Sequence, residues 1–190
     1  MKRILLSATV ALLSVVLYAQ DAHLKFKGIP VDGNYKAFAQ KLVAKGFKQM
    51  EATDDGIVLV GNFMATPDVM VIVYPDPSTK IVFNVSAMLE AGDSWPLIEK
   101  KFDEIVATYK EKYGEPTEYS EEFAPGVVNS DYYRRESIDN GQCYYKAVWD
   151  VEGGRIGIAP AYFMLKYYII CAYIDDENIK AVRKTIIDDI

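Results

Sequence analysis

The side chains that could carry chemistry are few in this 190-residue chain, which contains a single histidine and two cysteines. His23 lies a few residues into the expected mature chain, where termini are usually mobile. A Ser–His or Cys–His hydrolase needs a positioned base, and a zinc site needs several nitrogen or sulfur ligands. We therefore expect no catalysis of this kind, no bound metal and no cofactor.

Carboxylate chemistry is the remaining route to catalysis, because two acids suffice for glycoside hydrolysis. The chain has 27 aspartates and glutamates, so some pair will lie at a suitable distance in any fold, and the composition singles out none. No glycine loop precedes the lysine of a phosphate site, and Asp54-Asp55-Gly56 lacks the distal glutamate of a calcium loop. The sequence favours a non-enzymatic protein, with a small carboxylate-dependent hydrolase acting on polysaccharide as the alternative.

The two cysteines, Cys143 and Cys171, fall in separate expected strands. Export from the cytoplasm would permit a disulfide between them. Both could equally be buried free thiols, because cysteine packs as a small hydrophobic residue. The sequence leaves both alternatives open.

One constellation of aromatic and charged residues surrounds Asn140-Gly141, the strongest hairpin signal in the chain. A two-residue turn there would pair a strand over residues 131–138 with one over residues 142–151. That register gathers four side chains on one sheet face: Tyr132, Arg134, Glu136 and Tyr145. Such a face could be an interaction surface, whereas inward charges on an edge strand prevent edge-to-edge association. The protective edge is favoured, and either interpretation predicts that Arg134 and Glu136 serve association and not folding.

The elements that must position these residues follow from hydrophobic periodicity. Helical spacing occurs in residues 35–43, 98–113 and 179–190, and glycine ends the first two segments. Strands are predicted over residues 56–63, 69–74, 80–88, 131–138, 142–151, 155–159 and 162–174, with a turn at Pro160. This predicts an α+β fold with three helices and antiparallel meander sheets in one domain, residues 20–190. Residues 24–92 and 93–190 could be two weakly repeated helix-plus-four-strand units, and Trp149 continues an apolar alternation that places it in the core.

The first 19 residues have the pattern of a secretory signal. Lys2 and Arg3 give a positive start, an apolar run covers residues 4–17, and Ala19 is a small residue at the exit. We expect the mature protein to begin at Gln20 or Asp21, to lie in the periplasm or outside the cell, and to have no transmembrane segment. The formal net charge of −6 argues against a nucleic-acid partner.

The opening of the expected mature region resembles a known group of proteins. The residues that carry the likeness are Phe26-Lys27-Gly28-Ile29-Pro30-Val31-Asp32-Gly33, Phe38, Lys41-Leu42 and Lys45-Gly46-Phe47. They resemble a group of uncharacterised, signal-peptide-bearing secreted proteins of Bacteroidota, over about 25 residues of clear match. The resemblance implies an exported, envelope-associated bacterial protein and no catalytic residues.

These observations together predict an exported, non-enzymatic binding or interaction module of the bacterial envelope. Its partner could be a protein or a glycan, because tyrosines are frequent in the second half of the chain and suit both kinds of contact. Besides the hydrolase, a structural envelope component is the other alternative.

Overall fold

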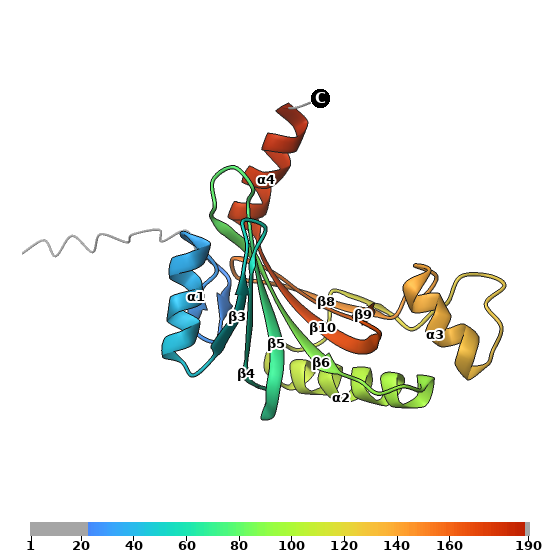
Figure 1. Ribbon diagram of the computed structural model, residues 1–190. Coiled ribbons are helices and arrows are strands. Elements are labelled where there is room, and N and C mark those ends of the chain that lie inside the picture. Colours follow the sequence, from blue (N-terminus) through green and yellow to red (C-terminus); the bar gives the residue numbers. More distant parts are fainter. Residues whose placement is uncertain (1–22, 189–190) are drawn as a thin grey trace, which may run out of the picture.

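The computed structural model describes residues 23–188 and confirms the α+β class. The expected signal, residues 1–19, lies outside the described residues, as does Ile190 of the last helical stripe. The chain forms a large antiparallel sheet, a small two-stranded sheet and four helices within the described part (Figure 1). Three of the helices correspond to those expected from the sequence, and one was not expected.

The elements follow one another in a simple order. They are β1 (Lys25–Phe26), β2 (Ile29–Pro30), α1 (Tyr35–Ala44), β3 (Lys48–Ala52), β4 (Ile57–Phe63), β5 (Thr66–Pro75), β6 (Val82–Glu90), α2 (Trp95–Tyr113), β7 (Glu118–Ser120), α3 (Asp131–Asp139), β8 (Lys146–Val151), β9 (Gly154–Phe163), β10 (Lys166–Asp175) and α4 (Asp176–Asp188). The eight-stranded sheet has the order β3-β4-β5-β6-β10-β9-β8-β7, and all its pairs are antiparallel.

The sheet order is symmetric about its centre, where β6 pairs with β10. On each side of that pair, one helix is followed along the chain by four strands, which run inward from the sheet edge. The second half differs because the connection between β7 and β8, residues 121–145, contains α3. The central pair therefore joins segments about 80 residues apart in sequence, a pairing that local periodicity alone does not specify.

Helices α1 and α2 cover the same face of the sheet. Helix α1 packs against β3, β4 and β5, while α2 packs against β8, β9 and β10. Their apolar stripes are buried, with Phe38 and Leu42 on α1 and Ile98 and Phe102 on α2 fully enclosed. The sheet is twisted, with α1 beside one half and α2 beside the other, and its other face is free of these two helices (Figure 1).

The strand expected over residues 131–138 is wrong, because this segment forms helix α3. Ser130 caps the helix by accepting a hydrogen bond from the Tyr133 backbone N–H, and Asp131 pairs with Arg135 one turn later. Asn140 is the C-cap, and Gly141 follows with a positive φ of 66°. The Asn-Gly pair therefore ends a helix here and does not form a hairpin turn.

The turn expected at Pro160 is also wrong, because β9 continues through it to Phe163. The β9–β10 turn consists of Met164 and Leu165, which both have positive φ angles, 47° and 63°. Two central residues with positive φ give the turn geometry whose twist matches a two-residue hairpin. Pro160 lies within the sheet opposite Ile169.

The N-terminal segment is anchored to the end of the sheet by Asp175, which is fully buried. Its carboxylate accepts hydrogen bonds from the Leu24 N–H and the Asn178 N–H and lies 3.0 Å from the His23 Nδ1. His23 also lies 3.5 Å from the Asp32 carboxylate. The single histidine therefore takes part in a structural contact that joins the N-terminal segment to Asp175.

Candidate functional site

The face of the sheet opposite α1 and α2 carries an apolar surface that crosses its central strands. We call it the helix-free face. One cross-strand row holds Val60, Met70, Met88, Ile170 and Ala159, and the next holds Val58, Ile72, Ser86, Ala172, Gly157 and Val148. An antiparallel sheet with one solvated face normally places polar side chains there. The centre of this face is aliphatic instead.

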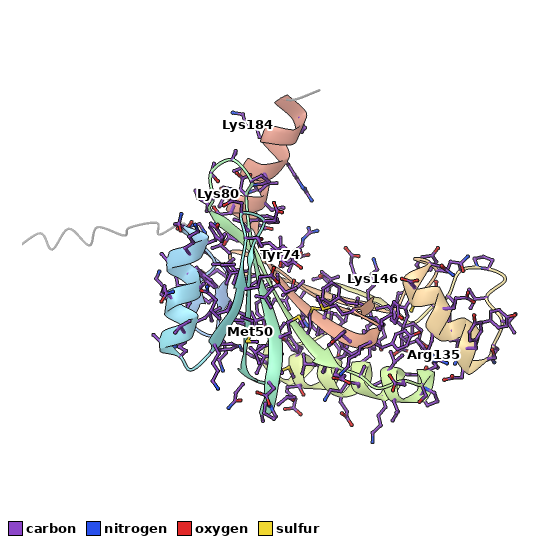
Figure 2. The ribbon with its side chains drawn as sticks, viewed as in Figure 1. Met50, Tyr74, Lys80, Arg135, Lys146 and Lys184 are labelled. Atoms are coloured by element: carbon purple, nitrogen blue, oxygen red, sulfur yellow. The ribbon has the colours of Figure 1, made fainter. Side chains whose placement is uncertain are left out.

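Most of these side chains are half-buried, and Met88 and Ser86 are buried, although α1 and α2 pack on the other face of the sheet. Neighbouring strands supply the burial, since side chains opposite one another on one face lie within contact distance. The effect is clear at Tyr74, whose hydroxyl pKa is raised by burial. Figure 2 shows Tyr74 and Lys146 on the side of the sheet that faces away from α1 and α2.

Ion pairs between adjacent strands border the helix-free face. Lys166 pairs with Glu90 at 2.9 Å, Arg155 with Asp150 at 2.8 Å, and Lys146 with Glu118 at 2.7 Å. The Lys146 ammonium holds the pKa of Glu118 below its usual range, chiefly through the hydrogen bond between them. An apolar centre with a charged rim is the usual anatomy of a protein–protein interface.

The interaction surface expected from the sequence lies elsewhere and is not on a sheet. Tyr132, Arg134 and Glu136 belong to α3, and the side chain of Tyr145 points into the helix-side core, where it is 7% exposed. Their common strand face was a wrong prediction because the hairpin register does not exist. The sheet edges are β3 and β7, so the protective-edge interpretation of Arg134 and Glu136 is wrong as well.

The structure does bring Arg134 close to Tyr145 through a shared aromatic cluster. The Arg134 guanidinium lies 5.2 Å from the Phe123 ring centroid and 5.8 Å from that of Trp95. The Tyr145 ring meets both of the same rings, at centroid distances of 5.2 Å and 4.8 Å. Arg134 therefore connects α3 to the core by cation–π contact. Tyr132 remains exposed.

The two cysteines are free thiols in the structure. Cys171 is fully enclosed beneath α2, and burial raises the pKa of its thiol to about 12. Cys143 is half-buried, and burial also raises its pKa. Neither cysteine has the lowered pKa of a reactive nucleophile.

We expect alkylation to report this arrangement directly. In the folded protein at mildly alkaline pH, Cys171 should resist iodoacetamide, because its thiol is enclosed and protonated. After unfolding without reductant, both cysteines should be modified, and intact-mass measurement counts the added groups. Modification that requires prior reduction would contradict the free thiols.

One aspartate, Asp103, has a raised pKa and lies near two other carboxylates. Burial raises the pKa of Asp103, and the nearby carboxylates of Glu121 and Glu99 raise it further. The groove between the β1–β2 hairpin and α2, described below, is lined by none of these three acids. Among residues 23–188, no cluster of histidine, cysteine, aspartate and glutamate is arranged to hold a metal ion. This arrangement adds no support to the hydrolase alternative.

A signal for the helix-free face is present in the sequence. In residues 69–74 and 166–174, apolar residues occur at both odd and even positions and so on both faces of the strand. This pattern indicates strands that are covered on two sides. Sequence alone does not show which strands lie side by side, so the rows could not be assembled.

Within residues 23–188, no helix is both long and apolar enough to cross a bilayer. Comparison with known protein families, with curated proteins and with solved structures gave no match to this chain.

Proposed function

We propose that this protein is an exported, non-enzymatic binding module of the bacterial envelope that holds a protein partner against its helix-free face. The observation that carries the proposal is the aliphatic centre of that face, which lies on the side of the sheet opposite α1 and α2. Contiguous apolar surface of this kind marks interaction sites in soluble proteins. Export is supported by the signal pattern of the first 19 residues.

A protein partner suits this face better than a glycan. Sugars are bound by aromatic platforms, whereas the two central rows contain valine, isoleucine, methionine and alanine with one serine and one glycine, and no aromatic residue. The charged rim adds selectivity, since its ion pairs favour a partner with matching polar groups around an apolar centre. The chemistry of the face is therefore that of a protein interface.

Substitutions at the centre of the face test the proposal. Ile72→Glu and Ile170→Glu should each weaken capture of the partner from envelope extract by about tenfold or more, because each places a charge in a desolvated contact. Both residues are half-buried, so the variants should keep the fold. Quantitative capture with the immobilised protein, together with thermal unfolding of each variant, provides the measurement.

Leu97→Glu is the matched control, because Leu97 is an exposed apolar residue on α2, away from the helix-free face. This variant should capture the partner as the wild-type protein does. Equal capture by all three variants would contradict the proposal. A concentration-dependent dimer that only the two face variants abolish would show that a second copy covers the face instead.

A further inference from the structure

A groove lies between the β1–β2 hairpin and the C-terminal half of α2, on the helix side of the sheet. Its volume is about 470 Å³, which is within the range of small-molecule sites. Phe63, Tyr109 and Tyr173 form its floor and are buried, while Met64 and Tyr113 are half-buried in its walls. We call it the tyrosine–lysine groove. The interior of the groove therefore suits the apolar part of a ligand.

The floor of the groove is held in place before any ligand binds. The hydroxyls of Tyr109 and Tyr173 form a hydrogen bond of 2.6 Å, which satisfies two buried polar groups against each other. Phe26 stacks on Phe63 at 5.4 Å between ring centroids and meets Tyr173 edge-on at 5.1 Å. A floor fixed in this way costs little ordering entropy when a ligand binds.

The mouth of the groove is basic. Lys25, Lys27 and Lys112 line it, and the lining residues include no aspartate or glutamate. Among the ion pairs formed within residues 23–188, none involves these three lysines. The Lys27 ammonium donates to the Asn62 carbonyl at 3.3 Å, and the Lys112 ammonium lies 4.6 Å from the Tyr113 ring centroid. Because these three cations have no carboxylate partner within residues 23–188, this part of the groove is locally positive in a chain of net charge −6.

We propose that the tyrosine–lysine groove binds a fatty acid, with the acyl chain against Phe63, Tyr109 and Tyr113 and the carboxylate among Lys25, Lys27 and Lys112. The apolar floor matches the chain and the three ammonium groups match the head. A cationic or neutral amphiphile of the same length would meet the same floor without a counter-charge at the mouth. The groove is on the opposite side of the sheet from the helix-free face, so this site is independent of the proposed protein partner.

Calorimetric titration with dodecanoate below its micelle concentration tests the site, with dodecyltrimethylammonium as the matched cationic probe. Dodecanoate should bind with one molecule per protein, and the cationic probe should bind at least tenfold more weakly. Non-specific adsorption would give the opposite order, because the whole chain is acidic. Absence of dodecanoate binding, or equal binding of both probes, would overturn the proposal.

Variants at the mouth and in the groove locate the site. Removing two ammonium groups, in Lys27→Gln/Lys112→Gln, should weaken dodecanoate binding by about tenfold. The control Lys41→Gln/Lys45→Gln removes the same charge from the exposed face of α1 and should leave binding unchanged. Thr108→Trp, which fills the groove from an exposed position on α2, should abolish binding.

Two results would place the ligand elsewhere and overturn the proposal. One is equal affinity for dodecanoate in the Lys27→Gln/Lys112→Gln variant and the Lys41→Gln/Lys45→Gln variant. The other is binding of dodecanoate by Thr108→Trp as strong as that of the wild-type protein. Ile72→Glu should bind dodecanoate normally, so a failure of the protein-partner proposal and a failure of this one can be told apart.

Discussion

Replacing Trp149 with alanine is expected to lower the free energy of unfolding by about 3–5 kcal/mol. Trp149 is 2% exposed, and its position in the core confirms the alternation expected from the sequence. It lies on β8 beneath the C-terminal end of α2, where its ring is 5.7 Å from that of Tyr109. The truncation would leave a cavity between the sheet and the helix.

The Trp149→Ala substitution removes a hydrogen bond as well as packing contacts. The Trp149 Nε1–H donates to the Gly114 carbonyl at 2.8 Å, and Gly114 is the C-cap of α2. Trp149→Phe keeps most of the apolar volume and loses this bond, so its cost should be smaller than that of Trp149→Ala. Val148→Ala, on the same strand but on the helix-free face, should cost about 1 kcal/mol or less.

Urea unfolding followed by circular dichroism measures all three variants. The dependence of unfolding free energy on urea should keep its slope, which shows that only stability has changed. A cost below about 1 kcal/mol for Trp149→Ala would mean that the β8–α2 contact contributes little to the core.

Much of the framework could be predicted from the sequence, because its elements are specified locally. The apolar stripes of α1 and α2 are long, and Gly46 and Gly114 follow them in positive-φ conformations. The connections between β3 and β4 and between β5 and β6 contain aspartate with glycine or proline, whereas the β4–β5 turn is Met64-Ala65. In both cases, the local pattern and the tertiary environment favour the same structure.

Helix α3 could not be predicted, for two physical reasons. It has no apolar stripe, since its residues are mostly polar and Ser137 is its one fully buried residue. In addition, Asn140-Gly141 suits a hairpin turn and a helix C-terminus equally well, because both need a residue that tolerates positive φ. Contacts with distant aromatic rings decide between them, through Arg134 on Trp95 and Phe123.

The candidate site could be predicted less well than the fold. Its rows depend on the pairing of β6 with β10, where Met88 meets Ile170 and Ser86 meets Ala172. These residues are more than 80 positions apart, and the sequence of neither strand specifies the strand it pairs with or the register of the pairing. Alternation shows that the strands have two apolar faces, but only the sheet order shows which face the helices leave free.

The second large effect is expected at Gly154, where alanine should cost about 3 kcal/mol or more. Gly154 is buried at the start of β9 and lies opposite Asp175 of β10. A Cβ atom there would stand 2.2 Å from the Ile174 carbonyl oxygen and 3.2 Å from the Asp175 Cα. Both neighbours are backbone atoms, so no side-chain rotation relieves the clash.

The strain would spread because the end of β10 holds other parts of the fold together. Moving β10 away from Gly154 displaces Asp175, whose carboxylate accepts the Leu24 N–H and the N–H of Asn178 in the first turn of α4. The alanine variant should therefore loosen the N-terminal segment and α4 together. Hydrogen exchange should detect faster exchange at Leu24 and Asn178 than in the wild-type protein.

Gly157→Ala is the matched control, because Gly157 lies on the same strand and a Cβ there would meet nothing within 4 Å. This variant should be neutral or stabilising by up to about 1 kcal/mol, since alanine restricts the unfolded chain more than glycine does. Thermal unfolding of the two variants side by side separates backbone collision from a general intolerance of alanine in β9. If both glycines tolerate alanine equally, β9 and β10 are not held at the close approach that the structure shows at Gly154.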